Sequence, residues 1–147
     1  MVRKLERIKT DQFKTYSQRI DDIEFFQGDT ITIPFQFIDY NDEPIELRGS
    51  PNSKTYVKWS LCPYGQYQNP LVELKSDPAN SSAGDIVIDE DTNIVYVNLN
   101  DSITNNLIYG KYVQQIVLYY DPLDGSDLKE FRRAQGFVNF KFKIEDM

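Results

Sequence analysis

The chain has 147 residues, of which 40% are hydrophobic and 27% charged, and its net charge is −7. This length and composition predict one folded domain and exclude a disordered chain. The sequence shows no apolar stretch of transmembrane length, and its first twenty residues are charged where a signal peptide would be apolar, so we expect neither membrane insertion nor secretion.

Two residue counts bear on chemistry. The chain has no histidine, which removes the commonest general base and metal ligand and makes an enzyme a poor expectation. Its single cysteine, Cys62, cannot form an internal disulfide, so a reducing cytoplasm suits the chain.

Charge divides the chain into two parts. Residues 1–20 carry six cations and two carboxylates, a net +4, which leaves −11 for the remainder. An acidic body repels nucleic acid, so we expect no nucleic-acid partner. We therefore predict a basic N-terminal arm over residues 1–22 and one domain over residues 23–147.

The predicted arm lacks a regular apolar stripe, which is typical of a segment that stays extended or disordered until a partner binds it. We expect the domain to stay folded when residues 1–20 are removed. An unused, disordered tail is the alternative. The candidate docking residues here are Arg3, Lys4, Leu5, Arg7, Ile8, Phe13 and Tyr16.

From residue 23 onward the hydrophobic period is two, as in half-buried strands. In residues 31–37, Ile31, Ile33, Phe35 and Phe37 share one face. Pro34 cannot donate a ladder hydrogen bond, which predicts an edge or a bulge there. Similar alternation recurs in residues 45–47, 56–62, 72–74, 86–88, 94–99 and 138–144, whereas residues 112–120 are apolar on both faces, as in a central strand.

About eight short strands without a long helix predict an all-β fold, and we expect a sandwich. Trp59 on an early strand, and Tyr112 directly after a helical turn capped by Asp101, favour an immunoglobulin-like β-sandwich with a tyrosine corner. The other interpretation is that Trp59 and Tyr112 are core residues of a different sandwich. Both interpretations make them structural.

One segment carries a family resemblance. The stretch Gln27-Gly28-Asp29-Thr30, the alternating strand after it, and the turn from Asn41 through Pro44 to Leu47 resemble the opening of the N-terminal domain of tailed-phage baseplate upper proteins. The resemblance is good over residues 25–47 and loose elsewhere. It implies an immunoglobulin-like module used in virions as an adaptor or decoration, and it brings no catalytic residues.

The resemblance predicts a virion structural protein, assembled in the host cytoplasm and attached to the capsid, head fibre or tail and baseplate through its arm and sandwich surface. Its partners would be other virion proteins, such as capsid, portal, fibre or tail subunits, and self-association is a further option. Tyr64 and Tyr67 lie in a loop rich in Pro and Gly near the outward Tyr56, and we predict them as further candidate contacts to a protein partner. The alternative function is a carbohydrate- or host-surface-binding module that uses the same two residues.

Other chemistry is disfavoured. The acidic clusters at residues 85–91 and 121–127 lack the spacing of a calcium loop, so we interpret them as solvated turns and predict no metal and no cofactor. Without histidine, neither a serine nor Cys62 has a base for a catalytic triad. We predict no enzymatic activity.

Overall fold

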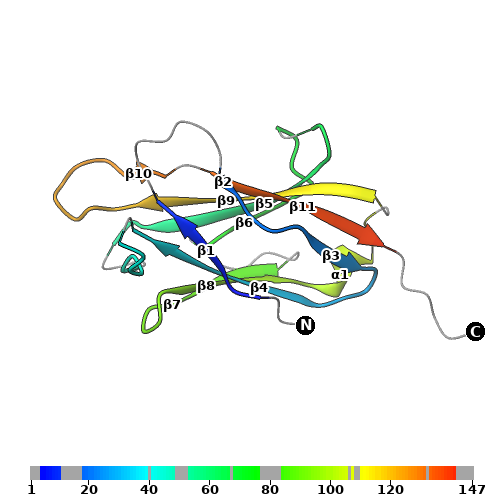
Figure 1. Cartoon of the computed structure of the whole chain (residues 1–147), viewed down its shortest axis with the longest axis horizontal. Coiled ribbons are helices and arrows are strands. Elements are labelled where there is room, and N and C mark those ends of the chain that lie inside the picture. The colour runs from blue at the N-terminus through cyan, green and yellow to red at the C-terminus, as the bar shows by residue number, and fades with distance from the viewer. Residues whose placement is uncertain are drawn as a thin grey trace, which may run out of the picture.

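Two β-sheets packed face to face form the body of the protein, as Figure 1 shows for this computed structural model. It describes residues 4–10, 18–39, 41–48, 53–66, 68–76, 84–105, 107, 110–131 and 133–141. Within these ranges, no helix is long and apolar enough to cross a membrane. The all-β sandwich predicted from the alternation is confirmed.

The first sheet, sheet A, has the strand order β1-β4-β8-β7. Its strands are β1 (Glu6–Lys9), β4 (Ile31–Ile38), β8 (Ile94–Leu99) and β7 (Gly84–Asp89). A short helix, α1 (Asp101–Thr104), follows β8, and its N-cap is Asn100, one residue before the predicted Asp101.

The second sheet, sheet B, has the strand order β2-β11-β9-β5-β6, and β3 and β10 pair with β11 and β9. Its strands are β2 (Gln18–Arg19), β3 (Ile23–Phe26), β5 (Tyr56–Pro63), β6 (Val72–Lys75), β9 (Gly110–Tyr120), β10 (Lys129–Glu130) and β11 (Ala134–Lys141).

The order of the longer strands is that of an immunoglobulin-like sandwich. In such folds the second, fifth and fourth strands share one sheet, and the seventh, sixth and third share the other. Here β4-β8-β7 and β11-β9-β5 take those places. Strand β9 pairs with both β5 and β11. It is buried from Tyr112 to Leu118, so the predicted central strand is confirmed.

The core lies between the sheets and is filled by the inward side chains of both. Trp59, Phe25, Phe35 and Phe37 are at most 1% exposed. The indole Nε1 of Trp59 donates a hydrogen bond of 3.0 Å to Oε1 of the buried Gln114. Both residues belong to sheet B, so this hydrogen bond joins the neighbouring strands β5 and β9 inside the core.

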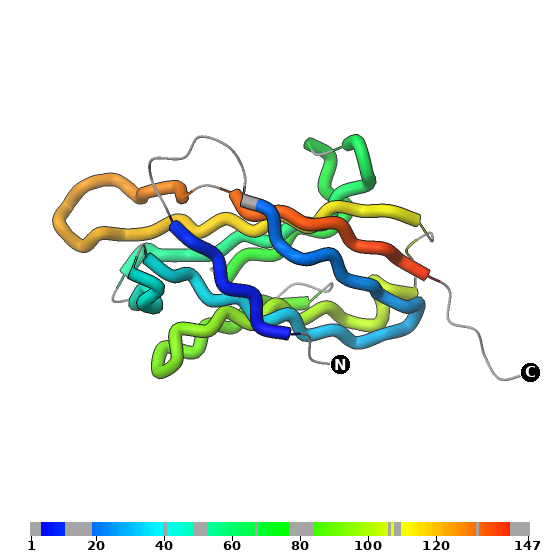
Figure 2. Tube along the Cα trace, viewed as in Figure 1, coloured from blue at the N-terminus to red at the C-terminus, as the bar shows by residue number. Residues whose placement is uncertain are grey.

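The predicted N-terminal arm is wrong for the described part of residues 1–22. Strand β1 pairs in parallel with β4, and its Ile8 is opposite Phe37 and only 1% exposed. Strand β2 pairs with β11, and Ile20 after it is 2% exposed. Figure 2 shows these N-terminal strands, in dark blue and blue, lying along both sheets. The segment is part of the sandwich because burial of Ile8 and Ile20 stabilises it.

The pairing of β1 also explains Pro34. The β1 ladder runs from Phe35 to Ile38 of β4 and ends beside Pro34. On its other side, Pro34 is opposite Tyr96 of β8. The proline therefore lies where this side of β4 has no described strand partner, which agrees with the predicted edge at this residue.

Candidate functional site

Four predicted docking residues of the N-terminal segment fall within the described residues. Lys4 and Arg7 are exposed and Leu5 is half-buried, whereas Ile8 lies in the core and is not available to a partner. Three others, Arg3, Phe13 and Tyr16, lie outside the described residues. Of the predicted docking residues, Lys4 and Arg7 therefore remain as exposed cations, beside Lys9 and Arg19 of the same segment.

Glu6 links β1 to the segment between β2 and β3. Its Oε1 accepts a hydrogen bond of 3.1 Å from the backbone N–H of Asp21. Burial raises the pKa of the Glu6 carboxyl above its ordinary value, the hydrogen bond from the Asp21 backbone lowers it, and the Asp21 carboxylate adds to the rise. The raised pKa makes this part of the fold sensitive to pH.

We expect Glu6→Gln to be more stable than the wild type at neutral pH and equally stable at acidic pH. A carboxyl whose pKa is raised on folding stabilises the protein below its unfolded pKa, and this contribution is lost as the pH rises through the folded pKa. Glutamine keeps the acceptor for Asp21 and removes the charge. The melting temperature of the variant should equal that of the wild type at about pH 4 and exceed it slightly, by about 1–2 °C, at neutral pH, because the side chain is only partly buried. A variant that is less stable at neutral pH would contradict this account.

The outer face of sheet B carries a cluster of aromatic and cationic side chains. The Tyr64 side chain is 56% exposed, and its ring centroid lies 5.8 Å from that of Phe137. Lys111 Nζ lies 4.9 Å from the Tyr64 ring and 4.0 Å from the Phe137 ring, and Arg19 Cζ lies 4.8 Å from Phe137. We call Arg19, Tyr64, Lys111 and Phe137 the aromatic–cation cluster. Such contacts hold the rings in place by cation–π attraction.

The predicted tyrosine platform is only partly brought together. Tyr67 lies outside the described residues. Tyr56 is at the opposite end of β5 from Tyr64, about 25 Å away for eight residues of extended strand. Tyr56 instead stacks on Tyr119, with ring centroids 4.5 Å apart and planes 12° apart. Tyr64 therefore has Phe137, not Tyr56, as its aromatic neighbour.

A hollow of about 270 Å³ opens on the same face, between Tyr119 and the loop around Pro70. We call it the outer-face pocket. Its central lining residues come from strands that neighbour one another: Lys58 and Ser60 of β5, Gln115 and Val117 of β9, Glu73 of β6, and Arg133 just before β11. Burial raises the pKa of Tyr119, and the nearby Glu130 carboxylate adds to this, so the phenol stays neutral at physiological pH.

Cys62 lies beneath this face. The residue is on the outward side of β5, but it is only 1% exposed. Burial raises the pKa of the Cys62 thiol, and a hydrogen bond with Ser60 acts in the opposite direction. A buried thiol with a raised pKa is a poor nucleophile.

The motif that carries the phage resemblance makes structural contacts. The Asp29 carboxylate accepts a hydrogen bond of 3.2 Å from the Phe26 N–H, and the Thr104 hydroxyl donates one of 2.8 Å to the Asp29 carbonyl. Gly28, between Phe26 and Asp29, has a positive φ of 83°, which glycine adopts readily. These residues close the turn from β3 to β4 and join it to α1.

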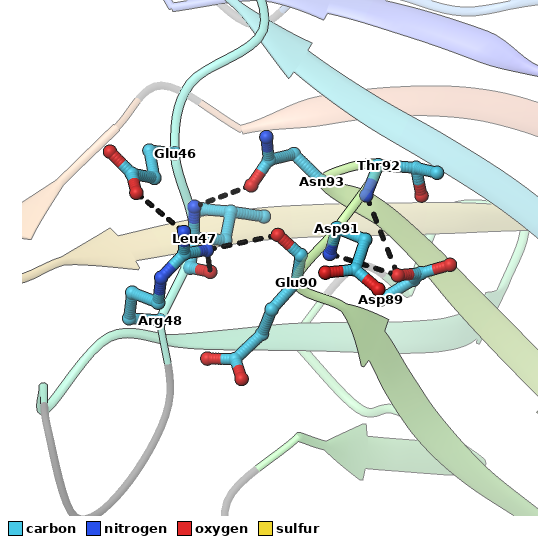
Figure 3. A network of polar contacts seen from close by, with 8 residues as sticks. All are labelled: Glu46, Leu47, Arg48, Asp89, Glu90, Asp91, Thr92 and Asn93. Carbon is cyan, nitrogen blue, oxygen red and sulfur yellow. Dashed lines mark hydrogen bonds and ion pairs between the residues drawn. The ribbon is translucent and has the colours of Figure 1, made fainter.

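The end of the motif is anchored to the β7–β8 hairpin, as Figure 3 shows. The Leu47 N–H donates to Oδ1 of Asn93 at 3.0 Å, and Arg48 Nη1 donates to the Glu90 carbonyl at 3.0 Å. The Asp89 carboxylate accepts the Asp91 N–H within the same hairpin. The acidic turn of the β7–β8 hairpin therefore has a structural role.

The second acidic loop is organised in the same way. The Asp121 carboxylate accepts the backbone N–H groups of Lys54 and Leu123, both at 2.9 Å, and these bonds lower its pKa. Hydrogen bonds from Ser126 lower the pKa of Asp124. Among the described residues, no three Cys, Asp or Glu side chains gather closely enough to hold a metal ion.

Sequence reasoning missed several residues of the outer face of sheet B. Arg19 belongs to the predicted arm but not to its candidate docking residues, and Lys111 and Phe137 are not among the predicted site residues. One signal was present: Phe137 falls on the polar side of the alternation in β11, between Gln135 and Asn139. A large aromatic on an otherwise polar strand face predicts a surface contact.

Comparisons with known proteins add little to this description. No protein-family model and no curated protein matches the chain. Among solved structures, the cysteine protease inhibitor EhICP2 from Entamoeba histolytica aligns with a TM-score of 0.37 and 12% identity, over 92% of this chain and 94% of that one. A likeness at this level supports no conclusion about function.

Proposed function

We propose that this chain is a non-catalytic structural protein of a tailed-phage virion, an adaptor or decoration that docks on a larger assembly through the outer face of sheet B. The observation that carries the proposal is the aromatic–cation cluster. Exposed tyrosine and arginine are the residue types that most often dominate binding at protein interfaces. The resemblance of residues 25–47 to a virion module supports the phage context.

Rigid placement of the cluster favours protein docking. Phe137 lies within β11 and Lys111 within β9, and the two strands pair in the register Phe137 with Val113 and Asn139 with Lys111. Side chains presented by paired strands lose little further freedom on binding, so more of the contact energy appears as affinity.

The second candidate function is binding to a carbohydrate or host surface through Tyr64. The observation in its favour is the 56% exposure of this ring in a loop beside the sheet. A glycan that binds the wild type and not Tyr64→Thr would support this candidate over the first.

The experiment is analysis of particles from the phage whose genome encodes the chain. Mass spectrometry of purified particles should detect the chain in a fixed ratio to the major capsid protein. The double variant Tyr64→Thr/Phe137→Thr should be incorporated much less, since loss of an interface anchor costs about 2 kcal/mol or more, about thirtyfold in affinity.

The matched control is Val87→Thr, which changes an exposed apolar residue, 48% exposed, on sheet A. It should be incorporated like the wild type. Absence of the wild-type chain from particles would refute the virion role, and equal incorporation of the double variant would refute docking through this face.

A further inference from the structure

The outer-face pocket brings together cations from separate strands. Lys58 on β5 is opposite Val117 of β9, and on its other side it is opposite Lys75 of β6. Arg133 precedes Ala134, which is opposite Ile116. Arg133 and Lys58 therefore flank Val117 from the two neighbouring strands, about 10 Å apart at their backbones, and both side chains line the pocket.

These cations have no ion-pair partner within the part of the chain that the structure describes. The ion pairs found there involve other cations, at Lys9, Arg19, Arg48 and Lys141. Lys58 of β5 and Lys75 of β6 are directly opposite each other, so their side chains lie next to each other on one face of the sheet. Two like charges in this arrangement destabilise a sheet unless an anion lies near. Glu73, opposite Ser60, is the carboxylate among the described pocket residues.

The interior of the pocket strengthens its attraction for an anion. Val117 is 4% exposed, and the neighbouring Ser60 and Gln115 are 7% and 6% exposed. Between Lys58 and Arg133 the floor is thus a buried aliphatic side chain rather than water, and a charge held there is less screened than on an open surface.

The size of the pocket selects its ligand. Sites for drug-sized molecules usually measure about 300–1,000 Å³, whereas this pocket measures about 270 Å³ and is open. That volume is small for a nucleotide and ample for one side chain. Among side chains, a carboxylate satisfies both cations.

We propose that the outer-face pocket binds a Glu or Asp side chain from an acidic peptide segment of the partner protein, with Lys58 and Arg133 as its cationic contacts. The inference rests on the proposed function for the identity of the protein that carries the segment. The binding chemistry is independent of it.

A peptide makes further contacts that a free carboxylate cannot. The Lys111 side chain of the aromatic–cation cluster lies six residues along β9 from Val117, about 20 Å away in an extended strand. An extended peptide of six residues spans the same distance. A run of acidic residues can therefore place one carboxylate in the pocket and another beside Lys111.

The test uses the full chain and a fluorescein-labelled hexaglutamate peptide, followed by fluorescence anisotropy at low ionic strength. We expect binding that weakens with added salt, and no binding of a labelled hexaglutamine peptide. The double variant Lys58→Gln/Arg133→Gln should weaken binding by about tenfold or more, the usual effect of losing hydrogen bonds to a charged group. Glu73→Gln should strengthen it about twofold, because a like charge is removed from the rim.

The matched control is Arg7→Gln/Lys9→Gln, which removes one Arg and one Lys from the outer side of sheet A. It changes the net charge by the same amount and should change affinity by less than about twofold. Equal weakening in both double variants would mean that hexaglutamate responds to net charge alone, and the pocket proposal would be wrong. Free glutamate that binds as tightly as the peptide would also refute it.

Particle incorporation separates this inference from the proposed function. If Lys58→Gln/Arg133→Gln loses the peptide but enters particles like the wild type, the pocket does not serve docking and the virion role stands. If the wild type binds the peptide but is absent from particles, the virion role is wrong and the acidic-peptide site stands.

Discussion

Replacing Trp59 by alanine is expected to lower the free energy of unfolding by about 3–5 kcal/mol. The side chain is fully buried between the sheets, so the substitution leaves a cavity in the core. It also leaves the Gln114 oxygen without its indole donor. Domains of this kind have about 5–15 kcal/mol of stability in total. The urea concentration at the unfolding midpoint should therefore fall sharply, and the variant should be close to unfolded without urea.

Two further core variants test the hydrogen bond. Trp59→Phe keeps most of the packing but leaves the buried Gln114 acceptor unsatisfied, at a cost of about 1–3 kcal/mol. Replacing Gln114 by leucine in the same protein removes the unsatisfied group and should recover part of that loss.

The exposed Tyr64→Thr is the control, and it should leave the free energy of unfolding within about 0.5 kcal/mol of the wild type. A Trp59→Ala protein with an unchanged midpoint would mean that Trp59 lies outside the core.

Replacing Ile8 by alanine is expected to cost about 2–5 kcal/mol, and deletion of residues 1–9 is expected to cost at least as much. Ile8 is the buried residue of β1, opposite Phe37 of the core. Deletion also removes the ladder along Phe35–Ile38 and exposes that side of β4. Thermal unfolding of the purified variants measures both effects.

The neighbouring Arg7→Ala is the control for Ile8→Ala. Arg7 is exposed, and a surface substitution of this kind usually changes stability by less than about 0.5 kcal/mol. If the deletion variant had the melting temperature of the wild type, β1 would be dispensable for the sandwich, and the prediction of a free N-terminal arm would be correct.

The sandwich itself was predictable from sequence because its information is local. Alternation with period two assigns side chains to faces, and in residues 56–62 the face of Val57, Trp59 and Leu61 is the one in the core. Apolar residues on both faces of residues 112–120 identified the central strand. Pro34 marked a place where a ladder ends, since proline lacks the donor that a ladder needs.

Other features were decided by tertiary structure alone. Strand β1 has four residues with one buried apolar side chain, too short a pattern to separate from a basic tail, and it is a strand because β4 offers a free side and the core accepts Ile8. The outer-face pocket and the aromatic–cation cluster join residues from both halves of the chain, such as Arg19 with Phe137 and Lys58 with Arg133. Their proximity follows from the register between strands distant in sequence. Composition and periodicity determine which side of a strand a residue faces, but not which strand lies beside it.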